Sequence, residues 1–377
     1  MTMADNADNK DKKVLNVPAL RFPEFTEEWE SVLLEDVAEF QKKRISSDLL
    51  NNSNYISTEN ILQNFGGVQN SISIPANTNV IEYQRGDVLL SNIRPYLKKV
   101  WLSDRHGGCS ADVFVLRGNQ CERRFLYYVI ASDRFINFVM SGAKGVKMPR
   151  GDKSQMEKFT FFIPTNVEQK KIAMFLSMLD ERIRLQNKII EKLETLIKGI
   201  RNNIISKIKG DCITLQDIAD IYQPQTIAST DLTEDGYLVY GANGIIGKYR
   251  SFNHEKEQIC ITCRGNTCGT VNFTEPKSWI TGNAMVINTD NYAKNVNKRY
   301  LFHYLSSINF NSIISGSGQP QIVRQPLAKL KLILPVLIIQ NRIAECLDAM
   351  FAKMKNEQSF LQILQIQKSC LLSQMFI

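Results

Sequence analysis

One helix-forming pattern occurs twice in this chain, and it constrains the fold more than any other feature of the sequence. From Ile172, a 4-3 spacing continues to Lys207, and nine of these eleven positions are apolar. From Ile343 the same spacing continues to Met375, and eight of these ten positions are apolar. An apolar repeat every 3.5 residues is typical of a coiled-coil seam. The sequence therefore predicts two long helices with matching buried faces.

The two predicted helices share more than a period. A proline precedes each of them, Pro164 and Pro335, and the polar residue Gln186 in the first seam corresponds to Glu357 in the second. Two unrelated amphipathic helices are the alternative interpretation, and the matching prolines and interruption argue against it. The first helix contains no proline and only Gly199 as a glycine. At about 1.5 Å per residue it should be roughly 60 Å long.

The repeat continues upstream of the helices. The sequence LEDVAEF over 34–40 returns as LQDIADI over 215–221, and SADVFVL over 110–116 returns as TGNAMVI over 281–287. Between these matched pieces the two copies differ almost completely. One scaffold with two different variable surfaces is expected when each copy recognises a different target.

Each copy is predicted to be an α+β domain with a mainly antiparallel, curled sheet. Short apolar runs such as GDVLLSNI and ADVFVLRG in the first copy, and QICITCRG and NAMVINT in the second, are bounded by turn residues and favour strands. An aromatic-rich helix should follow in each copy, over 123–142 and 298–316. The expected division is a tail and entry segment over 1–27, a first domain over 28–165, a central helix over 166–209, a second domain over 210–336 and a C-terminal helix over 337–377.

Composition narrows the class of protein. With 377 residues and 44% hydrophobic content, the chain can bury the cores of two domains. A net charge of +8 permits a nucleic-acid partner without establishing one. Eight cysteines without a disulfide framework favour a reducing, cytoplasmic location. No segment reaches the roughly 18 apolar residues of a membrane span, and no membrane contact is expected.

Motifs for catalysis and for metal binding are missing from the sequence. We find no P-loop, dinucleotide fingerprint, serine elbow or adenine-methyltransferase signature, so no catalytic residue is assigned. Cys260 and Cys263 form a C-x-x-C pair with Cys268 close by. A zinc site would need a fourth ligand, for which His254 is the nearby candidate. A strand with buried thiols is the simpler interpretation, and no metal is assigned.

The doubled order of these elements resembles the specificity subunit of type I restriction-modification systems over nearly the whole chain. The opening VPALRFPEFTEEWE resembles that of such subunits, and LEDVAEF and LQDIADI resemble the starts of their recognition domains. The junctions IPTNVEQKKIAMFLSMLDERI and LPVLIIQNRIAECLDAM also resemble those of such subunits, in which a proline precedes a long helix. One departure is VLII in the second junction, where polar residues are commoner, so the start of that helix should be more buried.

The resemblance implies two target recognition domains, separated by two antiparallel coiled-coil helices with pseudo-twofold symmetry. Each domain would read half of a bipartite, asymmetric site in double-stranded DNA. A helix of about 60 Å corresponds to roughly 15 to 18 base pairs, so the helix pair would act as a ruler between half-sites. This chain would bind no cofactor and supply no catalysis.

The partners are also implied by the resemblance. Two modification subunits, which carry S-adenosylmethionine and methylate adenine N6, would bind the chain. Restriction subunits that use ATP and Mg would complete an ATP-dependent nuclease. The candidate partner-binding residues lie at the starts of the two seams: Ile172, Leu176, Leu179, Ile183, Ile343, Leu347 and Met350.

Candidate DNA contacts are polar and basic residues in loops that differ between the copies. The alternative for each is an ordinary solvated loop residue. In the first copy the candidates are Asn92, Arg94, Lys98, Lys99, Lys144, Lys147 and Arg150. In the second they are Asn243, Lys248, Arg264, Asn266, Gln319, Gln321 and Arg324.

Two other functions are alternatives to DNA recognition. A self-contained restriction or methylation enzyme would need the motifs that are missing. A non-catalytic coiled-coil scaffold explains the helices, but it does not explain two divergent, loop-rich domains on one framework. The sequence leaves open the target bases and the gap between half-sites.

Overall fold

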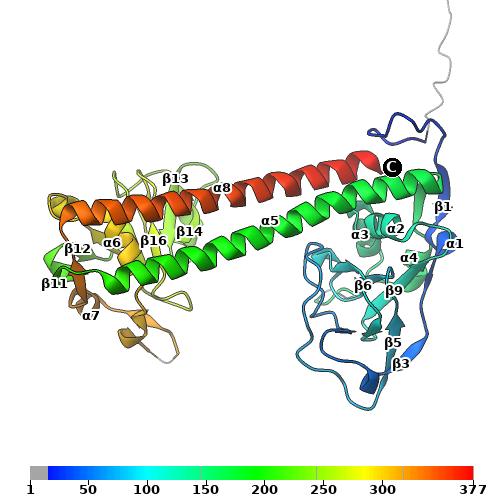
Figure 1. The fold of residues 1–377 in the computed structure, drawn as a ribbon, viewed down its shortest axis with the longest axis horizontal. Coiled ribbons are helices and arrows are strands. Elements are labelled where there is room, and N and C mark those ends of the chain that lie inside the picture. Colours follow the sequence, from blue (N-terminus) through cyan, green and yellow to red (C-terminus); the bar gives the residue numbers. More distant parts are fainter. Residues whose placement is uncertain (1–15, 146, 243, 317, 377) are drawn as a thin grey trace, which may run out of the picture. The chain divides into compact units, whose positions relative to one another are not determined.

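The computed structural model describes residues 16–145, 147–242, 244–316 and 318–376 (Figure 1). Contacts divide the chain into two compact units. Unit 1 comprises the described residues up to Leu185 together with those from Leu361 onward, and unit 2 runs from Gln186 to Phe360. Two long helices contribute to both units: α5 over Asn166–Lys207 and α8 over Leu337–Met375.

Unit 1 contains two four-stranded sheets and one two-stranded sheet. Within the described residues its strands pair antiparallel, apart from the parallel pair β4–β8. The two-stranded sheet is β1 (Glu30–Leu33) with β10 (Thr160–Ile163). The first large sheet has the order β2 (Ala38–Phe40), β9 (Val113–Gly118), β6 (Val88–Ser91) and β7 (Val100–Leu102). The second has the order β3 (Arg44–Ser46), β5 (Asn79–Tyr83), β8 (Gly107–Cys109) and β4 (Tyr55–Ile56).

The aromatic segment of unit 1 forms two helices, whereas the sequence predicts one over 123–142. Ser132 separates them because its hydroxyl accepts a hydrogen bond from the amide of Phe135 at 3.2 Å and caps the second helix. Phe125 and Phe135 are fully buried in one core with Ile172 of α5. In Figure 1, α2 and α3 lie beside the start of α5. The helices of the unit 1 domain are α1 (Leu34–Val37), α2 (Arg123–Ile130), α3 (Asp133–Ser141) and α4 (Lys153–Glu157).

Unit 2 repeats this plan with different loops. Its main sheet has the order β12 (Asp220–Tyr222), β18 (Ala284–Asn288), β15 (Ile259–Thr262) and β16 (Val271–Phe273). A three-stranded sheet contains β14 (Gly244–Tyr249), β13 (Tyr237–Gly241) and β17 (Trp279–Ile280), with β13 and β17 parallel. Two short antiparallel pairs are β11 (Asp211–Thr214) with β21 (Lys331–Leu334), and β19 (Ile314–Ser315) with β20 (Gln321–Ile322). The domain helices are α6 (Lys298–Leu305) and α7 (Arg324–Ala328).

The aromatic helix of unit 2 is also shorter than predicted over 298–316, because α6 ends at Leu305. The hydroxyls of Ser306 and Ser307 donate to the carbonyls of Phe302 and Tyr304 at 2.7 and 2.6 Å. Side-chain bonds of this kind compete with a continuing helical ladder. The chain then forms a short 3-10 turn over Phe310–Ser312.

The sequence repeat is visible in three dimensions. Gln186 and Glu357 lie 171 positions apart, and equivalent elements of the two units begin at this same offset. They are β6 and β15 (Val88, Ile259), β9 and β18 (Val113, Ala284), β10 and β21 (Thr160, Lys331), and α5 and α8 (Asn166, Leu337). The main sheets also share one strand order. The predicted α+β fold, with mainly antiparallel sheets and an internal repeat, is confirmed.

The two long helices pack antiparallel within each unit. In unit 1, Lys368 Nζ of α8 lies 2.5 Å from Asp180 Oδ1 of α5, and Asp180 also accepts the hydroxyl of Tyr128 at 2.8 Å. In unit 2, the side-chain amide of Gln186 donates to the carbonyl oxygen of Glu357 at 3.1 Å. The polar interruptions shared by the two seams therefore meet each other, an arrangement that fixes the register of a coiled coil.

A buried glutamine anchors the first turn of each long helix. Gln169 Nε2 donates to the carbonyl of Pro164, and Gln340 Nε2 donates to that of Pro335, both at 2.8 Å. The expectation that VLII makes the start of α8 more buried is wrong, since Ile338 is 60% exposed. The inward face of this turn is occupied by Gln340, so the extra apolar residues face solvent.

Candidate nucleic-acid interface

Both units hold one short hairpin against the residues that follow a central strand. Hairpin 1 is the segment closed by the bridge between Lys144 and Arg150, and hairpin 2 is the segment closed by the pair Ser315 and Gln321. Arg150 also bridges Ile93, just after β6, and Gln321 bridges Arg264, just after β15. Residues 146 and 317 of the two hairpins lie outside the described part of the chain. The two hairpins occupy equivalent places in the repeat.

The same three backbone hydrogen bonds hold each hairpin and its neighbouring loop. In unit 1 they run from Arg94 to Pro149 (2.8 Å), from Gly151 to Asn92 (3.1 Å) and from Asn92 to Asp112 (2.8 Å). In unit 2 they run from Gly265 to Pro320 (3.0 Å), from Ile322 to Cys263 (3.0 Å) and from Cys263 to Asn283 (3.0 Å). Because these bonds use only backbone atoms, the side chains can change without loss of the geometry. The scaffold is therefore suited to carrying a variable recognition surface.

In unit 1 most of the predicted contact residues come together, and several are already paired. Lys98 binds Asp133, Lys99 Nζ donates to the carbonyl of Thr58 at 2.7 Å, and Lys144 Nζ lies 2.7 Å from Asp152 Oδ2. Arg150 lies 3.4 Å from Asp112. The Lys144 ammonium holds the pKa of the Asp152 carboxyl below its ordinary value.

Arg94 and Lys147 are the exposed cations of this surface that form no ion pair within the described residues. Arg94 has a φ of 51°, in the left-handed region that side-chain-bearing residues seldom adopt. Its amide is held by Pro149, which fixes this conformation. Asn92 is half-buried, and its Oδ1 has no hydrogen-bond partner among the described residues. Arg94 and Lys147 are thus the side chains of unit 1 best placed to meet an external anion.

The candidate contact residues of unit 2 include more side-chain amides than those of unit 1. Arg264, Asn266, Gln319 and Gln321 are exposed or half-buried and lie on hairpin 2 or on the loop beside it. The other predicted contact residues of unit 2 that the structure describes do not lie free beside hairpin 2. Arg324 Nε donates to the carbonyl of Ile221 at 2.7 Å, Lys248 lies on β14 at 3.6 Å from Asp235, and Asn243 falls outside the described residues.

The two surfaces differ in chemistry. Arginine can bond both O6 and N7 of guanine, and asparagine or glutamine can bond N6 and N7 of adenine, whereas lysine more often meets phosphate. Among the described residues of the two surfaces, unit 1 presents cations, and unit 2 presents amides together with Arg264. The prolines Pro149 and Pro320 were missed as site residues, although the sequence places a proline in each loop.

The seam residues predicted to bind a partner are buried or partly buried by packing within the chain. Ile172 and Leu176 belong to the unit 1 core, and Leu347 is fully buried. Leu179, Ile183, Ile343 and Met350 are partly buried. This placement does not favour direct contact with a partner, because packing within the chain already covers the seam.

A second apolar stripe on α5 is exposed instead. Its residues are spaced alternately by four and seven positions, which keeps them on one helix face. Within unit 1 the stripe consists of Met174, Met178 and Leu185, and each is between 47% and 61% exposed. The sequence signal for it is an apolar residue two positions after each of the seam residues Ile172, Leu176 and Ile183.

The cysteine cluster of unit 2 has no metal-site geometry. Cys260 is buried in β15 and Cys263 is buried directly after it, and burial raises the pKa of the Cys260 thiol to about 12. His254 is committed elsewhere, with Nε2 2.9 Å from the hydroxyl of Tyr222 and Nδ1 2.6 Å from Asn253 Oδ1. In the part of the chain that the structure describes, no group of three or more His, Cys, Asp or Glu side chains is arranged to hold a metal. No helix there combines the length and apolarity required to cross a membrane.

A family model for the type I restriction modification DNA specificity domain matches residues 26–195 and again residues 211–365. The chain belongs to this family. The two matches assign one specificity domain to each copy of the repeat, and the resemblance to specificity subunits is confirmed.

Curated specificity subunits align over part of their length. The chain is 28% identical to the EcoprrI specificity subunit of Escherichia coli over 169 residues, which is 44% of this chain and 41% of that protein. It is 28% identical to a putative type I specificity subunit of Haemophilus influenzae over 116 residues, or 30% and 29% of the two chains. The chain thus spans less than half the length of the curated relatives it matches.

Two solved structures share the fold over nearly the whole chain. The type I restriction-modification S subunit from M. genitalium has a TM-score of 0.65 at 17% identity, covering 96% of this chain and 99% of that one. A chain from a study of complex assembly and conformational transition of the type I R-M system has a TM-score of 0.56 at 19% identity, covering 91% and 96%. At these identities the likeness shows the fold.

Proposed function

We propose that this chain is the DNA-reading specificity subunit of a type I restriction-modification complex, and that each unit reads one half of a bipartite, asymmetric duplex site. The observation that carries the proposal is the pair of hairpins. Each is fixed by the same backbone bonds, and each carries different exposed side chains. A constant frame with variable base-contacting groups is what a family of sequence readers needs.

The two half-sites are read by different chemistry. In unit 1, Arg94 and Lys147 approach the duplex as unpaired cations, so phosphate and guanine are their natural partners. In unit 2, Gln319 and Gln321 suit adenine, and Arg264 suits guanine. Each good bidentate contact contributes about 1–3 kcal/mol of discrimination. Because the surfaces differ, the combined site is not a palindrome.

The chain itself contributes recognition and no catalytic group. Methyl transfer to adenine N6 belongs to two modification subunits that carry S-adenosylmethionine, and restriction subunits with ATP and Mg supply cleavage. The exposed stripe on α5 that begins at Met174 is the docking surface we propose for a modification subunit, since exposed apolar patches mark interaction sites. The complex acts in the cytoplasm.

The test is a base-resolved map of N6-methyladenine in cells that carry the cognate modification subunit, with and without this chain. Gln321→Ala removes one amide from hairpin 2. Gln325→Ala is the matched control, because Gln325 is also an exposed glutamine of unit 2 and lies four residues later on α7.

We expect a split, asymmetric methylated motif that appears only when the chain is present. Gln321→Ala should relax the base preference within one half of that motif, and Gln325→Ala should leave the motif unchanged. Identical maps with and without the chain would exclude DNA reading and favour the scaffold alternative. A change in both halves on Gln321→Ala would contradict the assignment of one half to each unit.

A further inference from the structure

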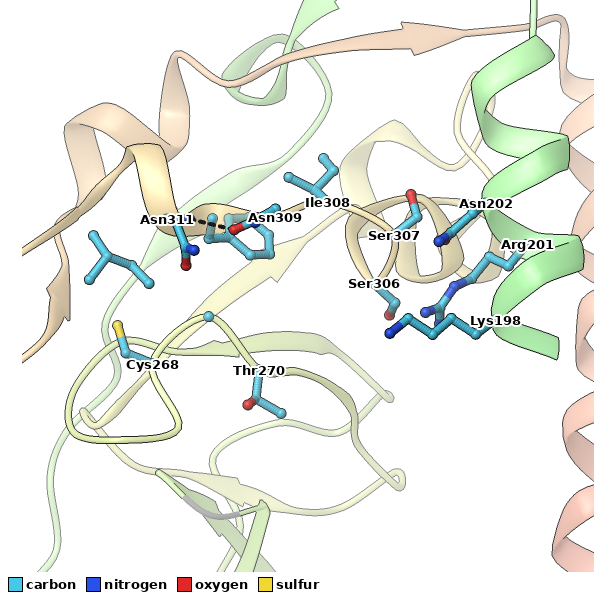
Figure 2. A pocket seen from close by; sticks show the side chains of 13 residues that line it. Lys198, Arg201, Asn202, Cys268, Thr270, Ser306, Ser307, Ile308, Asn309 and Asn311 are labelled. Atoms are coloured by element: carbon cyan, nitrogen blue, oxygen red, sulfur yellow. Dashed lines mark hydrogen bonds between the residues drawn. The ribbon is translucent and has the colours of Figure 1, made fainter. Parts of the chain in front are cut away.

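Unit 2 contains a polar cavity of about 440 Å³ that the proposed base contacts do not use. One wall is the last part of α5, with Lys198, Arg201 and Asn202. The opposite walls are the loop over 268–270 and the turn after α6. Figure 2 shows Lys198 and Arg201 extending from α5 toward Ser306, with Thr270 on the facing loop.

The lining of this cavity carries two cations and no carboxylate. Arg201 is half-buried, and its Nε is buried without a hydrogen-bond partner among the described residues. Neither Lys198 nor Arg201 forms an ion pair in the part of the chain that the structure describes. Burial lowers the pKa of Arg201 from its ordinary value, and guanidinium nonetheless stays charged in proteins. A half-buried cation whose Nε is buried without a partner points to a missing anion.

The neighbouring polar groups define what kind of ligand fits. The hydroxyls of Ser306 and Ser307 already donate to backbone carbonyls, so they offer only lone pairs to the cavity. Asn309 accepts the amide of Asn311 through Oδ1 at 2.9 Å, which leaves its Nδ2 free to donate. The donors that line the cavity include the guanidinium of Arg201, the ammonium of Lys198 and Nδ2 of Asn309, and N–H donors of this kind bind oxyanions.

The scaffold does not need these charges. At the offset of the repeat, Lys198, Arg201 and Asn202 correspond to Ser369, Leu372 and Ser373, and none of these counterparts is charged. The equivalent stretch of α8 in unit 1 therefore carries no such basic pair. The cations belong to unit 2 alone and are not a packing requirement of the repeat.

The cavity and the candidate interface are built from the same chain segments. The loop that begins at Arg264 beside hairpin 2 ends at Thr270 in the cavity wall, and the amide of Cys268 donates to the carbonyl of Gly265 at 3.0 Å. On the other side, Ile314 of β19 lines the cavity, and β19 pairs with β20, which carries Gln321. Two short segments thus connect the base-reading residues to the walls of the cavity that holds the two cations.

We propose that this cavity is a phosphate-binding site, and that its occupant is a phosphodiester group of the DNA backbone beside the half-site read by unit 2. The planar guanidinium of Arg201 would donate hydrogen bonds to two phosphate oxygens, and Lys198 would add a positive charge. The proposal rests on the proposed function, since it places the DNA of unit 2 against α5. Free phosphate has the same chemistry and is the alternative source.

The test uses the full chain assembled with its modification subunits and a duplex that contains the mapped site. Arg201→Gln and Lys198→Gln each remove one charge, and Lys192→Gln is the matched control on an exposed, non-lining position of α5. The dependence of log K on log salt should become shallower by about 0.9 for each lost phosphate contact. A second readout is broadening of the ³¹P resonance of inorganic phosphate by the protein.

We expect a shallower salt dependence for Arg201→Gln and for Lys198→Gln and no change for Lys192→Gln, with phosphate broadening lost in the same two variants. Lost broadening with an unchanged salt slope overturns the assignment to DNA and identifies free phosphate as the occupant. Wild-type behaviour of both variants in both assays overturns the site. If the wild-type complex itself lacks sequence-specific binding, the proposed function fails instead.

Discussion

The burial of the helix seam leads to a sharp prediction about Leu176 and Leu347. These residues hold the same seam position in the two copies of the repeat, and each is 0% exposed. Truncation to alanine removes buried apolar area and leaves a cavity, which together destabilise by about 2–5 kcal/mol. We take about 3 kcal/mol for each leucine, because both sites are fully enclosed.

This free energy translates into a measurable shift in melting temperature. Unit 2 runs from Gln186 to Phe360, in the size range where about 1 kcal/mol shifts the Tm by roughly 2–4 °C. Leu347→Ala should therefore lower the Tm of unit 2 by about 6–12 °C. Leu176→Ala should lower that of unit 1 by a similar amount, because Leu176 is equally buried.

The assay is thermal unfolding of the full chain without partners, followed by circular dichroism and fluorescence. Met178→Ala is the control on the same helix, since Met178 is 57% exposed and surface substitutions usually change stability by less than about 0.5 kcal/mol. Binding of the modification subunit should weaken for Met178→Ala, whereas the leucine variants should mainly lower the Tm. If Leu347→Ala left the Tm unchanged and abolished capture, the seam would be a partner surface and our reasoning would be wrong.

Three further predictions concern an ion pair, a histidine and a lysine. Arg21→Met should destabilise unit 1 by about 3–5 kcal/mol, because the bidentate partner of Arg21, Glu168, would stay buried and unpaired. Burial lowers the pKa of His303, so the unfolded chain takes up this proton first and stability falls as pH drops below about 6.5; His303→Gln should flatten that fall in Tm. Lys147→Gln should reduce the salt slope of DNA binding by about 0.9, and Lys144→Gln by less, since Asp152 already pairs with Lys144.

For each of these predictions one result would contradict the reasoning. Glu168→Ile copies Ile339, its counterpart in the second copy of the repeat, and should recover most of the stability lost by Arg21→Met; no recovery would show that the loss has another origin. An unchanged pH profile of Tm in His303→Gln would assign the acid sensitivity to other groups. Equal salt slopes for the two lysine variants would show that the pair with Asp152 does not limit contact with DNA.

Much of the architecture was predictable because it depends on periodicity. The 4-3 spacing gave both long helices, and the structure buries or partly buries the apolar residues of the seam from Ile172 to Ile204 and from Ile343 to Met375. The shared polar interruption was also visible in the sequence, and Gln186 does meet Glu357. Local patterns of this kind survive folding because the helix itself sets the spacing.

The failures have a common cause. The sequence predicts one aromatic helix in each copy, whereas Ser132 and Ser306 divide or end it through hydrogen bonds with the backbone. The apolar residue Ile338 was expected to be buried, but Gln340 takes the inward position. In each case a side chain satisfied a particular backbone group, which apolar periodicity does not encode.

The sequence by itself determined the tandem repeat, the class of fold, the two long helices and the family. Tertiary structure alone decided which polar residues act together. Hairpins 1 and 2 meet the loops after β6 and β15 from distant parts of the chain, and the cavity at Arg201 joins three segments that the sequence keeps apart. Residues far apart in sequence share a surface only through long-range packing, and no local pattern records that packing.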